Sequence, residues 1–164
     1  MRSSAASDVY KRQIYDAFYD DYGKGKAFMH SHTYAGNPLA CSAANAVLDI
    51  LRDEQIIPHA VENAKYFNKI IKEKFEDLPY VGEVRHIGLV NAIEIVKDKK
   101  TKVAYPSNLR LGYQIYKKAL KKGVLLRPLG DVMYFNPPLI IQPDDMDFVT
   151  DVAKECMIDV MNSL

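Results

Sequence analysis

The sequence predicts an α+β fold in which helices pack on one side of a small, mostly antiparallel sheet. Four segments repeat apolar residues every three or four positions, as amphipathic helices do; they are 38–53, 60–77, 106–122 and 143–160. Two other stretches, 81–96 and 124–141, are apolar and contain turn residues, which favours short strands. No internal repeat interrupts this order, so the chain predicts one layered α+β arrangement.

A short helix over 14–22 comes first, because Ile14 and Phe18 stand at helical spacing and Gly23 and Gly25 follow. The helix over 38–53 is then predicted by its start, where Asn37 can cap free backbone N–H groups and Pro38 suits the first helical position. A break over 51–58 precedes the next helix, which runs over 60–77.

The stretch 81–96 is rich in β-branched residues and contains Gly88, which indicates two short strands or one strand with a bulge. A helix over 106–122 follows and ends at Gly123. Next, Gly130 and Asp131 form a pair favoured in tight hairpin turns. Pro143 opens the last helix, whose buried side is predicted at Met146, Val149, Ala153, Cys156 and Val160.

The composition excludes several classes of protein. Twenty-two basic residues balance 21 acidic ones, so nothing global indicates nucleic acid or an anionic membrane surface, and we interpret the lysine clusters at 97–102 and 116–123 as solvated charge. No apolar stretch approaches the ~20 residues that span a bilayer, and no segment resembles a signal peptide. Cys41 and Cys156 lie in apolar helical patterns, which predicts buried reduced thiols in a cytoplasmic protein.

The loop over 30–37 is the first candidate binding site, because its polar residues precede a helix N-terminus, where phosphate is favoured. The Thr33 hydroxyl could donate to a phosphate oxygen; the alternative is a helix-entry turn without a ligand. His30 and His32 invite a metal interpretation, but zinc needs three or four ligands and no cysteine or carboxylate partner is near. We therefore predict no metal site.

Arg127 is the second candidate, since it interrupts an otherwise apolar run just before the hairpin turn. An unpaired buried guanidinium is costly, so the side chain either faces water or has an anionic partner. Its planar fork suits bidentate binding of a carboxylate. The residues alone leave both interpretations open, an exposed arginine at a strand end and a clamp for a substrate carboxylate.

Three motifs carry a resemblance to a known family: "HSHTYAGNPLACSAA", "VRHIGLVNAIEI" and "GVLLRPLGDVMYFNPPLII". In this order and spacing they resemble the C-terminal part of class III aminotransferases, which are pyridoxal 5'-phosphate enzymes of fold type I. The similarity covers 14–164. It implies that the α+β fold is the small C-terminal domain of such an enzyme, and that the full-length enzyme is a homodimer acting on small molecules.

The resemblance assigns roles to five residues. His32 and Thr33 match the loop that reaches the cofactor phosphate of the neighbouring subunit. Ser31 falls beside the substrate, where many relatives have glycine. Arg127 matches the arginine that holds the carboxylate of the keto acid, which favours the clamp over the exposed strand end, and Tyr134 lines the same end of the pocket.

The family's Schiff-base lysine has no match in this chain, so no catalytic residue is assigned. We interpret 1–13 as a non-native leader, 14–54 as a joining segment and 55–164 as the small domain, with the large domain missing and the chain inactive alone. The resemblance is strongest to class members of biotin synthesis, which transfer the amino group of S-adenosylmethionine to 8-amino-7-oxononanoate. The alternatives are an ω-amino acid:pyruvate or ornithine-type transaminase and a non-catalytic interaction domain.

Overall fold

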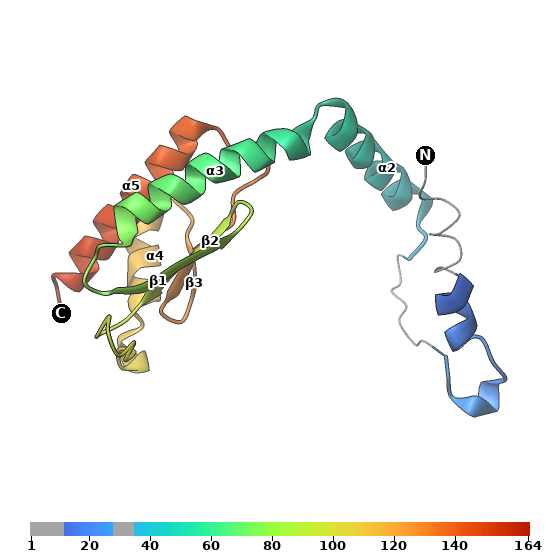
Figure 1. Cartoon of the computed structure of the whole chain (residues 1–164), viewed down its shortest axis with the longest axis horizontal. Helices are drawn as coiled ribbons and strands as arrows, with labels where there is room; N and C mark the ends of the chain where they lie inside the picture. Colours follow the sequence, from blue (N-terminus) through green and yellow to red (C-terminus); the bar gives the residue numbers. More distant parts are fainter. Residues whose placement is uncertain (1–11, 28–34) are drawn as a thin grey trace. The chain divides into compact units, whose positions relative to one another are not determined.

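The structure is a computed structural model that describes residues 12–27 and 35–164 (Figure 1). Two compact units divide the chain, Met1–Asn45 and Ala46–Leu164. The second unit contains a four-stranded sheet and three long helices. This arrangement confirms the predicted α+β fold.

The first unit has little regular structure among its described residues. Residues 12–18 are helical and a 3-10 turn, η1, covers Tyr22–Lys24, so the predicted helix over 14–22 ends early. The carboxylate of Asp20 explains the end, because it accepts the backbone N–H of Asp21 at 2.8 Å and binds the ammonium of Lys24 at 2.7 Å. Local side-chain bonds of this kind compete with the helical ladder.

Helix α2 spans Pro38–Asp53, as predicted. The Oδ1 atom of Asn37 accepts the backbone N–H of Ala40 at 3.1 Å, which confirms the predicted cap. The prediction that Cys41 is buried is wrong: α2 buries none of its residues and Cys41 is exposed. A helical apolar pattern predicts which face can be covered, whereas burial also needs a covering element, and α2 has none among the described residues.

The two cysteines should therefore differ sharply towards a thiol reagent. Cys41 is exposed, whereas burial raises the pKa of the Cys156 thiol and keeps it from the reagent. Under native conditions we expect one rapid thiol reaction per chain with an aromatic disulfide reagent, and a second only after denaturation. The Cys41→Ser variant should lack the rapid phase; a rapid phase that survives in this variant would contradict the structure.

Helix α3 spans Ile56–Phe75 and starts earlier than predicted. The break is confined to the residues around Gln55, which takes a left-handed conformation with φ 53°. Pro58 lies inside the first turn, where its missing N–H has no partner to lose. The buried side of α3 is formed by Ala60, Ala64, Phe67, Ile70, Ile71 and Phe75.

The sheet consists of four antiparallel strands in the order β1-β2-β4-β3. Their bounds are Val81–Ile87 for β1, Val90–Ile95 for β2, Arg127–Leu129 for β3 and Val132–Phe135 for β4. Gly88, at φ 55°, turns the chain between β1 and β2, so two strands form rather than one. The register shifts between Val81 and Glu83, which places a bulge in edge strand β1.

Helix α4 spans Leu111–Lys121 and begins later than the sequence predicts. A 3-10 turn, η2, covers Ser107–Leu109, and Arg110 then takes a left-handed conformation with φ 49° that separates the turn from the helix. Helix α5 spans Pro143–Met161, with Pro143 in its first turn as predicted.

The three helices of the second unit form one layer against the sheet (Figure 1). Helix α3 packs on β1 and β2, α4 packs on β3, and α5 contacts both helices. Aromatic rings fill the centre: Phe67 meets Phe135 edge to face at 5.8 Å, and Phe75 lies 6.3 Å from the same ring. The core therefore joins α3 to β4, a strand far away in the sequence.

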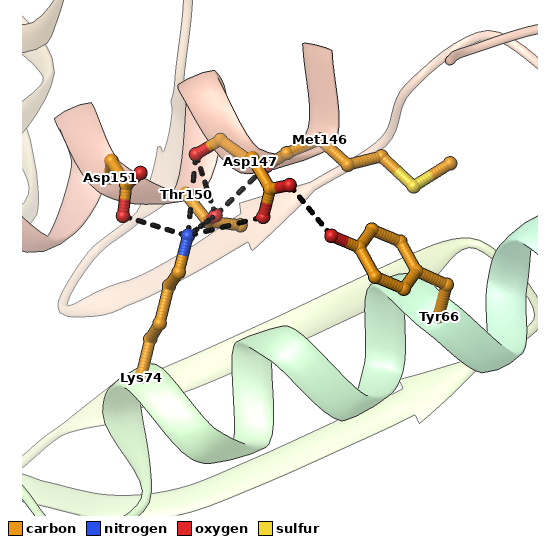
Figure 2. Close-up of polar contacts among 6 residues, drawn as sticks. All are labelled: Tyr66, Lys74, Met146, Asp147, Thr150 and Asp151. Carbon is orange, nitrogen blue, oxygen red and sulfur yellow. Dashed lines mark hydrogen bonds and ion pairs between the residues drawn. The ribbon is translucent and has the colours of Figure 1, made fainter. Parts of the chain in front are cut away.

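Polar contacts join α3 to α5 at the edge of this core (Figure 2). The ammonium of Lys74 lies 2.7 Å from the carboxylate of Asp151 and 2.8 Å from the buried hydroxyl of Thr150. The Tyr66 hydroxyl donates to Asp147 at 2.6 Å. Lys74 is only 21% exposed, so its charge acts partly shielded from water.

Replacing Lys74 with methionine should lower the free energy of unfolding by about 1–2 kcal/mol, because Thr150 and two carboxylates lose a charged donor in a shielded place. Urea denaturation measures this change. The matched control is Lys69→Met on the same helix, where the side chain is 69% exposed and its ammonium lies 3.8 Å from Glu73. We expect the control to change stability by less than about 0.5 kcal/mol; equal losses would refute the shielded role of Lys74.

Tyr66 gives a pH prediction. Its hydrogen bond to the Asp147 carboxylate, together with partial burial and nearby acidic charge, raises the pKa of Tyr66 above its ordinary value of 10.0. A raised pKa in the folded state contributes stability below about pH 10 that is lost as pH rises through the folded-state pKa. The difference in the free energy of unfolding between wild type and Tyr66→Phe should therefore stay constant up to about pH 10 and shrink above it. Denaturation curves at increasing pH measure it, and a gap that widens would contradict the hydrogen bond.

Candidate carboxylate-binding site

Arg127 and Tyr134 lie directly opposite each other on β3 and β4. Directly opposed residues of antiparallel strands share one face of the sheet. Met133 and Phe135, which flank Tyr134, are buried, so Tyr134 and Arg127 lie on the face opposite this core side. The register continues the same row through Ala92 of β2 to Arg85 of β1. The structure thus brings together the two substrate-contacting residues that the sequence predicts on this sheet.

Both residues line a pocket of about 590 Å³ in the second unit. Apolar side chains from three places form much of its wall: Leu125 before β3, Ile140 after β4 and Phe148 on α5. Among the described residues of the wall, Asp145 is the one acidic residue. Arg127 is the cationic residue among the described residues that line the pocket, and most of the other lining residues are apolar.

Arg127 differs from the other arginines that the structure describes. Arg12, Arg52 and Arg85 each form an ion pair with a carboxylate, and Arg110 lies over the ring of Tyr113 at 4.3 Å. Arg127 is exposed, and none of the described carboxylates lies within ion-pair distance of it. Its guanidinium therefore has its donors available for a carboxylate from outside this unit.

The contrast is sharpest with Arg85, which stands in the same row across the sheet. Its guanidinium lies 3.0 Å from Glu94 and 3.6 Å from Glu83. The carboxylate of Glu83 also forms an ion pair with the ammonium of Lys102 at 3.3 Å. The β1 end of the row is thus neutralised within the protein, whereas the Arg127 charge at the β3 end is not paired with a carboxylate of the described residues.

Three predicted residues, Ser31, His32 and Thr33, lie outside the described residues. The structure describes only the end of their loop, where Gly36 has φ 73° and Asn37 caps α2. The described residues therefore include Arg127 and Tyr134 but not the residues predicted to contact the cofactor phosphate.

The contribution of α5 to the pocket was not predicted from the sequence. Asp145 and Phe148 of this helix line the pocket, and the sequence predicted no role in binding for either residue. The sequence feature that could have indicated this contribution is the run of Asn136, Pro137 and Pro138 after β4, which also lines the pocket. Two prolines restrict the backbone of the segment that leads from β4 to α5.

Other kinds of site find little support in the part of the chain that the structure describes. Among residues 12–27 and 35–164, no group of three or more His, Cys, Asp or Glu side chains could hold a metal ion. In the same residues, none of the helices combines the length and the apolar character that crossing a membrane requires.

Comparisons with known proteins agree with the motifs. The family model described as aminotransferase class-III matches residues 4–157. The adenosylmethionine-8-amino-7-oxononanoate aminotransferase of Aquifex aeolicus is 40% identical over 142 residues, which are 87% of this chain and 31% of that protein. The putrescine–pyruvate aminotransferase of Pseudomonas aeruginosa is 34% identical over 145 residues, which are 88% of this chain and 31% of that protein.

A solved structure shows the same fold. The crystal structure of adenosylmethionine-8-amino-7-oxononanoate aminotransferase from Methanocaldococcus jannaschii matches with a TM-score of 0.80 at 38% identity, covering 90% of this chain and 34% of that one. The chain thus spans about a third of the length of these relatives.

Proposed function

The chain belongs to the class-III aminotransferase family, whose members use pyridoxal 5'-phosphate, and from this premise we propose that it is part of an aminotransferase of biotin synthesis. The whole enzyme transfers the amino group of S-adenosylmethionine to 8-amino-7-oxononanoate. This chain supplies the group that binds the substrate carboxylate.

The observation that carries the proposal is the guanidinium of Arg127 beside an apolar pocket, since none of the described carboxylates pairs with it. A nine-carbon keto acid has a carboxylate followed by methylene groups, and these two parts suit a cation and an apolar wall respectively. Tyr134 lines the same pocket next to Arg127 and orients the bound acid. Ser31 contacts the substrate from the loop before α2.

In this proposal His32 and Thr33 contact the cofactor phosphate of the neighbouring subunit in a homodimer. When bound, pyridoxal 5'-phosphate supplies the electron sink that lets an amino group move between substrates. The residues of this chain bind and orient the substrate and the cofactor phosphate, whereas the Schiff-base lysine belongs to the large domain. In this proposal residues 14–54 join that domain to the small domain over 55–164, and the whole enzyme is cytoplasmic.

A second candidate function is a transaminase that uses pyruvate as its keto acid. The Pseudomonas aeruginosa relative is named putrescine–pyruvate aminotransferase, and it matches nearly the same share of this chain. An arginine that binds a carboxylate serves either keto acid. The long apolar wall beside Arg127 favours the nine-carbon acid over pyruvate.

The test is an assay of the full-length enzyme that contains this segment, loaded with pyridoxal 5'-phosphate. We expect amino transfer from S-adenosylmethionine to 8-amino-7-oxononanoate and none to pyruvate. Transfer to pyruvate instead would establish the second candidate. The 164-residue chain alone is the control and should be inactive; activity of this chain would refute its role as a part of a larger enzyme.

A further inference from the structure

The turn of the β3–β4 hairpin is held by contacts on two sides. The backbone carbonyl of Asp131 accepts the N–H of Ile95 at 3.0 Å, which ties the turn to β2. Its side-chain Oδ1 lies 3.5 Å from the N–H of Gly112, in the first turn of α4. The hairpin that carries Arg127 is therefore positioned by a strand on one side and by a helix start on the other.

Gly112 is the point of closest approach between α4 and the hairpin. A β-carbon added to Gly112 would lie closer to the carbonyl oxygen of Gly130 than β-carbons come to other atoms in real proteins. It would also lie 2.8 Å from the β-carbon of Pro128. The first of these atoms is backbone, so no side-chain rotation relieves the overlap. Gly130 itself has φ 61°, which the tight turn requires, and this limits how the turn can adjust.

The hairpin yields more easily than the helix. Leu111 and Ile115 are fully buried and fix the start of α4 in the core. Strand β3 has three residues, stands at the sheet edge and pairs only with β4. A side chain at position 112 would therefore displace β3, and Pro128, which it meets directly, is adjacent to Arg127 in the sequence.

We propose that Gly112 is a positioning residue for substrate binding: its missing side chain lets α4 set the place of the hairpin and so aim Arg127 at the substrate carboxylate. This inference rests on the proposed role of Arg127. A bidentate carboxylate site depends on direction as well as charge, so a small displacement of the guanidinium weakens binding.

Gly82 supplies a matched control. A β-carbon there would lie 2.7 Å from one γ-methyl of the buried Val96, so an alanine at position 82 is also crowded, but against a core side chain rather than against the hairpin. Gly82 lies in β1, at the opposite edge of the sheet from Arg127. Both variants should lose stability, but only Gly112→Ala should change carboxylate binding.

The experiment measures kcat and KM for 8-amino-7-oxononanoate in the full-length, cofactor-loaded enzyme. We expect Gly112→Ala to raise KM about tenfold while kcat stays within about twofold, because the displaced guanidinium weakens binding rather than the chemical step. Gly82→Ala should leave KM within about twofold. Equal KM values for the two variants would overturn the inference.

Two further variants keep the outcome decisive. If Gly112→Ala does not fold, Asp131→Ala removes the acceptor that faces the Gly112 N–H, and it should raise KM severalfold; an unchanged KM would overturn the inference. Arg127→Met tests the premise separately. If Arg127→Met leaves KM unchanged, the proposed function fails, whereas an effect of Arg127→Met without one of Gly112→Ala or Asp131→Ala rejects only the positioning role.

Discussion

Replacing Arg127 with methionine should lower kcat/KM of the full-length enzyme for 8-amino-7-oxononanoate by roughly 30- to 1,000-fold, or about 2–4 kcal/mol. Methionine keeps an apolar stem in the pocket wall but removes every donor to the carboxylate. The kcat/KM of Arg127→Lys should lie between those of the wild type and Arg127→Met, because an ammonium keeps the charge but lacks the planar fork of a guanidinium. Steady-state kinetics measures all three enzymes.

The control for this experiment is Arg85→Met. Arg85 stands in the same row of the sheet, but Glu94 and Glu83 already occupy its guanidinium. The control should keep kcat/KM within about threefold of the wild type, since exposed ion pairs contribute little. A loss as large as that of Arg127→Met would mean that the sheet face, and not the free guanidinium, determines activity.

Replacing Phe75 with alanine should lower the free energy of unfolding by about 3–5 kcal/mol. The ring is fully buried and lies 6.3 Å from Phe135, so its loss opens a cavity between α3 and the sheet. This loss is a large fraction of the total stability of an ordinary domain, about 5–15 kcal/mol. Urea denaturation followed by circular dichroism measures it.

Val61→Ala on the same helix is the control, because Val61 is 53% exposed. Although Val61 is apolar, it does not belong to the buried side of α3. We expect the control to change stability by less than about 0.5 kcal/mol. If both variants lost equal stability, the packing of α3 on the sheet would differ from the structure.

Helix-cap and turn residues correctly predicted the local structure in which they take part. Asn37 with Pro38 predicted the start of α2, and Gly130 with Asp131 predicted the hairpin, because each pair acts on its own backbone. The boundaries at Gln55 and Arg110 were wrong. Both residues take left-handed conformations that ordinary side chains rarely adopt, and nothing in their types indicates this.

Contacts between distant residues could not be predicted in the same way. The Lys74 ammonium meets carboxylates more than seventy positions away, and helical spacing carries no information about which helix will face it. At the candidate site, Arg127 was singled out because a lone charge in an apolar run is unusual. Gly112 gave a weaker signal, a glycine inside a helical pattern, which favours a packing role without naming the partner.

The two edge strands also determine whether strands of other chains can pair with this sheet. An exposed edge presents unpaired N–H and C=O groups to which a strand of another chain can add, and such addition begins aggregation. Strand β3 has only three residues, and Pro128 among them lacks an N–H, whereas β1 combines a bulge with the charges of Glu83 and Arg85. Both edges thus carry features that hinder the growth of the sheet into fibrils.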